Sequence, residues 1–230
     1  MSQPSKQDIT AGQQIYRPWA LKLYNIIVLW FSNNWAWRCS RHRQLQHYQK
    51  NISSNHLDVG IGTGYYLDHV NFPTNSPKLT LMDLNPNCLY YSQQLLSRYS
   101  PKIYKHDVFQ PLNDLNDQYD SIGVNYLLHC LPGNLDQKKI ALANLAKKLT
   151  PNGILFGSTI LGDSAKHNFV GKYLISLYDR KKIFCNRQDS VEDLKKILNQ
   201  LFREVHVEVV GAVALFTAKS LQTQSPQDPS

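Results

Sequence analysis

A glycine-rich turn behind an acidic residue is the strongest chemical signal in this chain of 230 residues. In the segment HLDVGIGTG, Asp58 precedes the first glycine by two positions. The glycines then alternate along the turn as Gly60, Gly62 and Gly64. Glycine permits positive φ angles and lets the backbone approach a ligand closely. Because ligands of open α/β sheets bind beyond the carboxyl ends of the strands, this turn predicts a ligand site.

Two common phosphate-binding motifs do not match the turn. A dinucleotide motif requires a small residue three positions after its second glycine, where this chain has Tyr65. A P-loop requires Gly-Lys followed by Ser or Thr, and no such sequence follows the turn. The Asp58 carboxylate would also repel a diphosphate, whereas it would attract an ammonium group such as that of an amino acid.

Two further carboxylates follow predicted strands. Asp83 closes LTLMD, where a carboxylate accepts hydrogen bonds from both hydroxyls of a ribose in dinucleotide sites. Asp107 closes the next strand, where it would accept a hydrogen bond from the exocyclic amine of adenine. Each aspartate alone is more often a helix cap or a solvated loop residue. Ammonium, ribose and adenine taken in strand order describe S-adenosylmethionine (SAM).

Strands and helices are predicted to alternate after residue 55. The expected strands are 56–59, 78–83, 102–107, 119–126, 153–160, 204–210 and 213–218. The expected helices begin near residues 63, 85 and 190, and another carries an apolar stripe over 142–149. Two more span 15–50 with a break at 32–34. This alternation predicts an open, mostly parallel sheet with right-handed crossovers. The last strand follows too closely for a crossover, so it should run antiparallel in a hairpin around Gly211.

From about residue 55 to 218 the chain resembles class I SAM-dependent methyltransferases. The segments that carry the resemblance are LDVGIGTG, MDLNP, HDVFQPL, YDSIGVNYLLHCLPG and LTPNGILFGSTIL. With its Tyr- and Trp-rich start and KHNFVGKYLISLYDRKKIF, the whole chain resembles a bacterial and fungal branch. Some members of that branch methylate hydroxyls of polyketide-type natural products. The resemblance implies a Rossmann-like α/β fold with a seven-stranded sheet whose last strand is reversed.

The resemblance also implies a set of cofactor contacts. Asp58 would lie near the methionine ammonium, with the three glycines along the backbone turn. The remaining expected contacts are Asp83 and Leu84 at the ribose, Asp107 and Val108 at the adenine, Asn125 and Tyr126 beside the sulfonium, and Tyr16 from the N-terminal segment.

His129 is the candidate catalytic base. It follows the fourth strand in NYLLHCLPG, near the place where the methyl group should be presented. The pKa of an unperturbed histidine, near 6.5, suits proton transfer at neutral pH. The alternative is a histidine that packs on the cofactor pocket or donates a hydrogen bond there.

The segment 162–189 is a predicted insertion between a strand and its helix, where substrate caps often occur. His167, Phe169 and Tyr173 are its candidate substrate contacts. Phe169, Tyr173 and Leu177 share one helical face, which forms either a substrate wall or a surface packed on the sheet. The expected organisation is then a helical cap at 1–54, a SAM-binding domain at 55–220 and a disordered tail at 221–230.

Composition limits the alternatives. A hydrophobic fraction of 42% excludes a disordered chain. The net charge is +8, and residues 1–50 carry +6 of it, from seven basic side chains and one acidic. The basic start of the chain makes an RNA methyltransferase an alternative. Because the basic residues form no run, nucleic acid is not the expected partner. The second alternative is a non-catalytic SAM-binding protein that acts through partners.

The remaining composition favours a cytoplasmic protein. The four cysteines are far apart and form no zinc-binding pattern, so we expect no metal site and a reducing compartment. The most apolar stretch, residues 21–31, is too short to span a bilayer. The sequence therefore predicts a cytoplasmic enzyme that transfers a methyl group from SAM to a small aromatic or polyketide-like acceptor, with oxygen as the favoured acceptor atom. It does not indicate the oligomeric state.

Overall fold

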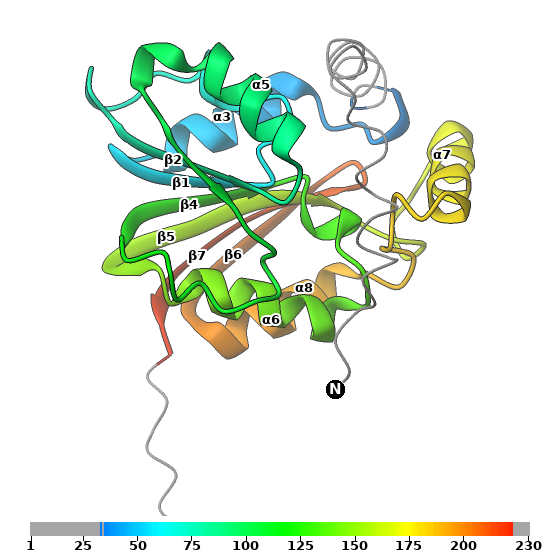
Figure 1. The fold of residues 1–230 in the computed structure, drawn as a ribbon. Coiled ribbons are helices and arrows are strands. Elements are labelled where there is room, and N and C mark those ends of the chain that lie inside the picture. The colour runs from blue at the N-terminus through cyan, green and yellow to red at the C-terminus, as the bar shows by residue number, and fades with distance from the viewer. Residues whose placement is uncertain (1–32, 34, 223–230) are drawn as a thin grey trace, which may run out of the picture.

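The computed structural model describes Asn33 and residues 35–222 as a sheet between two layers of helices (Figure 1). The strands are β1 (Asn55–Val59), β2 (Lys78–Asp83), β3 (Lys102–Lys105), β4 (Tyr119–Asn125), β5 (Leu149–Ile160), β6 (Phe202–Val210) and β7 (Val213–Leu221).

The order of the seven strands confirms the predicted fold class. It is β3-β2-β1-β4-β5-β7-β6, and the pairs among β1 to β5 are parallel. Strand β7 lies between β5 and β6 and runs antiparallel to both. The β6–β7 hairpin turns at Gly211, which has a φ of +61°. The order reverses between β1 and β4, which leaves a crevice at their carboxyl ends.

Helices cover both faces of the sheet. They are α3 (Arg41–Asn51), α4 (Tyr65–His69), α5 (Pro86–Leu95), α6 (Leu135–Ala146), α7 (Phe169–Arg180) and α8 (Val191–Leu201), with short 3₁₀ helices η2 (Ser97–Tyr99) and η3 (Leu128–Cys130). Figure 1 shows α3 and α5 on one face, α6 and α8 on the other, and α7 outside the layers at one end.

Side-chain caps fix where several helices begin. The Asn85 side chain accepts a hydrogen bond from the Asn87 backbone, and Pro86 occupies the first position of α5. Asn134 and Gln137 form a capping box at the start of α6. The cap at Asn85 starts α5 directly after the end of β2 at Asp83.

The start of α3 corrects the predicted helix from Trp35 to Tyr48. The helix begins only at Arg41, because the Ser40 side chain caps it and Arg38 has a φ of +54°, which a helix does not accept. Trp37, which the helical pattern included, is buried before the helix starts.

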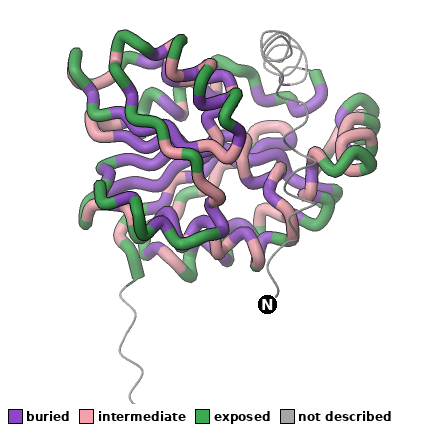
Figure 2. Tube along the Cα trace, viewed as in Figure 1, coloured by how far each residue is buried: buried purple, intermediate pink, exposed green. Residues whose placement is uncertain are grey.

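The core lies on both sides of the sheet, as the buried strands in Figure 2 show. One cluster joins the strands to α6 and α8, and a second joins them to α3, α4 and α5. A third cluster packs Trp37 against Phe184 and Ile175 at the α7 end. Burying each large apolar side chain stabilises the fold by roughly 1.5–3 kcal/mol. No helix within the described part of the chain is long and apolar enough to cross a membrane.

Candidate functional site

Two adjoining cavities open at the carboxyl ends of β1, β2 and β4. The β2–β3 cavity is lined by Asp83, Leu84, Asp107 and Val108 among others. The β1–β4 cavity is lined by Asp58, the glycine turn and the first turn of α4, together with Asn125. Both cavities share three lining residues, which are Gly60, Gly62 and Tyr126. The fold thus brings together the strand-end residues that the sequence singled out.

The glycine turn has the positive φ angles that glycine alone accepts readily. Gly60, Gly62 and Gly64 have φ of +70°, +54° and +73°. A Cβ added at Gly60 would lie 2.8 Å from the Leu127 Cδ1 atom, so the Leu127 side chain would have to shift. A Cβ added at Gly62 would meet only the Gly60 carbonyl oxygen, at 4.0 Å. Open space therefore lies against the Gly62 backbone, which is where a ligand would approach.

Backbone amides on both sides hold the Asp83 carboxylate. Gly62 N donates to Oδ2 at 3.3 Å, and Asn85 N donates to Oδ1 at 2.8 Å. Burial raises the pKa of the Asp83 carboxyl to about 6, and the charge of Asp58 adds to this rise. The amide hydrogen bonds oppose it. The result is a fixed acceptor at the β2 end, with lone pairs left for hydroxyl donors.

The Asp107 side chain lies farther along the same cavity. Its Oδ1 atom accepts a hydrogen bond from Phe109 N at 3.0 Å. Val108 and Phe109 are buried beside it, and Leu84 completes an apolar wall. An apolar slot with a carboxylate at its edge suits a flat heterocycle that carries an amine.

Asp58 and Asn125 supply opposite hydrogen-bonding functions to the β1–β4 cavity. Asp58 is buried, and its carboxylate accepts a hydrogen bond from the Tyr48 hydroxyl. Ser158 Oγ donates to Asn125 Oδ1 at 3.2 Å, which orients the amide. The Asn125 Nδ2 atom is buried and has no hydrogen-bond partner among the described residues. An acceptor and an unsatisfied donor side by side suit the ammonium and carboxylate of an amino acid.

Tyr126 stands between the two cavities in a left-handed conformation, with a φ of +54°. Gln44 of α3 donates to its hydroxyl at 2.6 Å, and the hydroxyl donates to Asn33 Oδ1 at 2.8 Å. Tyr66 donates to the Gln44 carbonyl at 2.5 Å. Strained backbone of this kind is common at functional sites. Helix α3 thereby fixes the two aromatic side chains at the mouth of the site.

His129 lies outside the linings of both cavities. It is 3% exposed, and its Nδ1 atom accepts a hydrogen bond from Ile160 N at 3.4 Å. Its ring packs edge-on against Phe184, with 4.6 Å between centroids. Burial lowers the pKa of His129 to about 3, and the Lys138 ammonium adds to the fall. The imidazole is therefore neutral and weakly basic, and its role as a catalytic base stays a prediction.

The candidate substrate contacts of segment 162–189 lie outside both cavity linings as well. The His167 Nε2 atom lies 2.8 Å from the Gly162 carbonyl, and its ring meets Trp37 edge-on. Phe169 and Tyr173 are 86% and 57% exposed on α7. Their substrate roles stay predictions. From this segment, Ile183 lines the β2–β3 cavity instead.

The N-terminal candidate Tyr16 lies outside the described residues. Several lining residues escaped the sequence interpretation, namely Leu127, Cys130, Leu131, Pro132, Ile183, Tyr65 and Tyr66. They are apolar or aromatic and have no chemical function of their own, although most of them lie in segments that carry the family resemblance. Within the described part of the chain, no group of three or more His, Cys, Asp and Glu residues is placed to hold a metal ion.

The residues present fit SAM. The open space at Gly62, the anchored Asp83 acceptor and the unsatisfied Asn125 donor match the backbone contact, the ribose and the amino-acid end of that molecule. When bound, SAM supplies an activated methyl group, so the protein supplies binding, orientation and exclusion of water.

Comparison with known proteins defines the class. A family model described as a methyltransferase domain matches residues 57–155. The chain is 35% identical over 212 residues to demethylluteothin O-methyltransferase of Streptomyces thioluteus, covering 92% of each. It is 36% identical over 209 residues to the physcion biosynthesis cluster O-methyltransferase of Aspergillus chevalieri, covering 90% of this chain and 94% of that one. The chain therefore belongs to the methyltransferase family.

Two further proteins are similar to this chain, one in sequence and one in fold. It is 44% identical over 191 residues to the uncharacterized protein YbcY of Escherichia coli strain K12, covering 81% of this chain and 96% of that protein. The N-methyltransferase NodS of Bradyrhizobium japonicum WM9, solved with S-adenosyl-L-homocysteine, has a TM-score of 0.56 at 19% identity, with 78% and 85% of the two chains covered. That likeness shows the shared fold. The protein is a SAM-dependent methyltransferase, as the strand-end residues predict.

Proposed function

We propose that this enzyme methylates an oxygen atom of a small aromatic or polyketide-like acceptor. The observation that carries the proposal is the sequence identity of about 35% to two O-methyltransferases over nine-tenths of the chain. The name of the first relative refers to demethylluteothin and that of the second to a physcion biosynthesis cluster. The apolar side chains of Leu131, Pro132 and Ile183, which line the β2–β3 cavity, support the same class of acceptor.

The acceptor would lie beside Tyr126, against Leu131, Pro132 and Ile183. These side chains offer apolar contact to a planar molecule and exclude water from the reacting atoms. Tyr126 is fixed by Gln44, so it limits where a ring can stand. Alignment of acceptor oxygen, methyl carbon and sulfur is then the main contribution of the protein to the rate.

The cofactor contacts belong to the same proposal. Asp58 and Asn125 receive the amino-acid end, Asp83 with Leu84 the ribose, and Asp107 with Val108 the adenine. In support, each of these residues lines one of the two cavities. A phenolic acceptor loses its proton readily, so it requires little help from a general base such as His129.

The test uses the purified chain with isotopically methyl-labelled SAM and a panel of acceptors. The panel contains phenols, hydroxypyrones, hydroxyanthraquinones, primary amines and total RNA, and mass spectrometry locates the label. The proposal expects label on a hydroxyl oxygen of an aromatic compound. Label on RNA would instead support an RNA methyltransferase. SAM binding without transfer to any member of the panel, or to a cell extract, would support a non-catalytic binding protein.

A further inference from the structure

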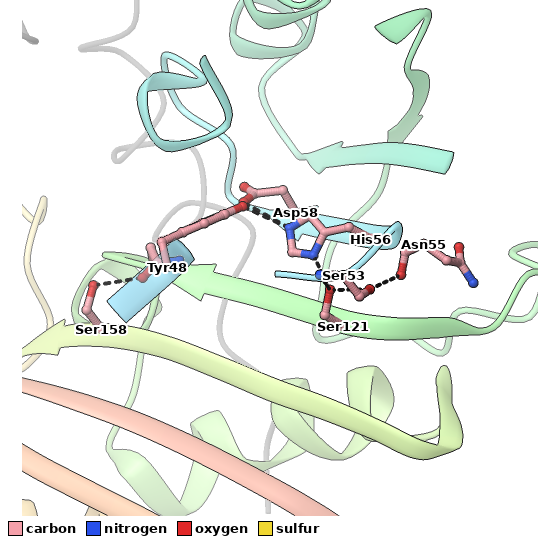
Figure 3. Close-up of polar contacts among 8 residues, drawn as sticks. Tyr48, Ser53, Asn55, His56, Asp58, Ser121 and Ser158 are labelled. Carbon is pink, nitrogen blue, oxygen red and sulfur yellow. Dashed lines mark hydrogen bonds and ion pairs between the residues drawn. The ribbon is translucent and has the colours of Figure 1, made fainter. Parts of the chain in front are cut away.

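A chain of buried polar groups runs behind the Asp58 carboxylate and away from the cavity. Figure 3 shows Tyr48, His56 and Asp58 converging, with Ser121 and Ser53 beyond the imidazole. Tyr48 comes from α3, His56 and Asp58 from β1, and Ser121 from β4. Tyr48, His56 and Ser121 are fully buried. Neither Tyr48 nor His56 lines either cavity, so neither would touch the cofactor.

The directions of the hydrogen bonds follow from counting protons. A carboxylate only accepts, so the single hydroxyl proton of Tyr48 is donated to Asp58 Oδ2. The Tyr48 oxygen also lies 2.8 Å from His56 Nε2, and there it can only accept. The His56 Nε2 atom must therefore carry a hydrogen. The order of donation is from imidazole to phenol to carboxylate.

The far side of the imidazole is fixed as well. His56 Nδ1 lies 2.7 Å from Ser121 Oγ, which in turn accepts from Ser53 N at 2.9 Å. The β4 backbone packs against the pair at Gly123, where a Cβ would lie 3.2 Å from both Asp58 Oδ2 and His56 Cε1. The imidazole therefore has no room to turn away from Tyr48.

Tyr48 is held by aromatic packing on several sides. Its ring stacks on Tyr66 at 5.4 Å and 8°, and meets Phe156 edge-on at 5.0 Å. Burial, followed by the nearby Asp58 charge, raises the pKa of Tyr48 well above its usual value of 10. The phenol thus remains a donor at any pH at which the protein works. Its hydroxyl occupies one carboxylate oxygen of Asp58, while Oδ1 has no hydrogen-bond partner in the described chain.

We propose that Tyr48, backed by His56, is a positioning residue that aims the free oxygen of Asp58 at the ammonium group of SAM. This inference rests on the proposed cofactor contact of Asp58. Helix α3 would then affect cofactor affinity through Asp58, although neither Tyr48 nor His56 would contact the cofactor. Without the hydroxyl, the carboxylate would rotate toward His56 Nε2, which lies 3.7 Å from Oδ2.

The test is calorimetric binding of two ligands to Tyr48→Phe. S-adenosylhomocysteine carries the amino-acid ammonium, whereas 5′-methylthioadenosine lacks it. We expect the Kd of S-adenosylhomocysteine to rise about three- to tenfold and that of methylthioadenosine to stay within about twofold. With an acceptor in hand, KM for SAM should rise while kcat at saturating SAM stays unchanged.

Tyr119→Phe is the matched control. Its hydroxyl is also buried and donates to Thr80 Oγ1 at 3.2 Å, but it lies at the opposite end of β4. This variant should leave both Kd values unchanged. Equal losses for both ligands in Tyr48→Phe, or no loss for either, would overturn the positioning role. Failure of the unmodified protein to bind S-adenosylhomocysteine would instead overturn the proposed cofactor site.

Nitrogen NMR of the unmodified protein keeps the inference testable if Tyr48→Phe does not fold. We expect His56 to carry a slowly exchanging hydrogen on Nε2, and its signals to shift with S-adenosylhomocysteine but not with methylthioadenosine. A bare Nε2 atom, or equal shifts with both ligands, would contradict the inference.

Discussion

The carboxyl ends of the strands and the segment 162–189 differ in how their candidate residues are placed. Asp58 and Asp83 lie at the carboxyl ends of β1 and β2, and all three aspartates line the paired cavities. Asp107, which the sequence predicted to close its strand, follows the end of β3 by two residues. Phe169 and Tyr173 of α7 are exposed outside those cavities. A strand end is placed by the sheet itself, because parallel strands present their carboxyl ends at one edge. A helix in an insertion is placed by contacts that no local pattern states.

Substitution at a strand end should have the largest effect on SAM affinity. Asp83→Ala removes an acceptor that two backbone amides hold in place, so SAM affinity should fall by about 1–3 kcal/mol, or roughly 5- to 150-fold. Titration calorimetry with S-adenosylhomocysteine measures this loss. Asp117→Ala removes an exposed partner of Lys102 and serves as the control, with unchanged affinity. If both variants bound S-adenosylhomocysteine with equal affinity, Asp83 would not be a cofactor contact.

The effect of pH on SAM affinity should be smaller than that of Asp83→Ala, and it should depend on the same Asp83 carboxylate. Hydroxyl donors require the ionised form of Asp83, whose pKa is raised to about 6. SAM affinity should be level above pH 7 and fall about tenfold by pH 5, because protonation competes with binding. Asp83→Asn should flatten this step. A step of the same size in that variant would assign the titration to another group.

Substitutions on α7 should have the smallest effect on SAM affinity. Phe169→Ala and Tyr173→Ala remove side chains that are largely exposed, so SAM affinity and thermal stability should change little, by less than about 0.5 kcal/mol. Steady-state kinetics with an identified acceptor would sharpen the comparison. A large rise in the acceptor KM would show that α7 contacts the substrate after all.

The sequence predicted much of the fold and several residues that line the candidate site. The alternation of elements predicted the sheet, and the hairpin at Gly211 predicted the reversed strand, because both depend on local spacing. Asp83 lies at a β2 end that the hydrophobic pattern marks directly. The position of Ile183 and the burial of His129 depend on how segment 162–189 folds back on the sheet, and no periodicity encodes this.

The hydrogen bond between Tyr48 of α3 and Asp58 could not be predicted from the sequence either. Tyr48 and Asp58 are ten positions apart, and the helical pattern indicates only that Tyr48 belongs to an apolar face. Its hydroxyl partner depends on where α3 begins, which Ser40 and Arg38 determine. A shift of that helix by one turn would remove the contact. Predicting that a helix forms is therefore not enough to predict that Tyr48 meets Asp58.

A crystal structure of the protein with S-adenosylhomocysteine tests the cofactor site most directly. We predict the ribose hydroxyls within hydrogen-bonding distance of the Asp83 carboxylate, the homocysteine ammonium at Asp58 and the adenine between Leu84 and Val108. A ligand bound outside the two cavities, or one that binds there with its ribose turned away from Asp83, would contradict this assignment.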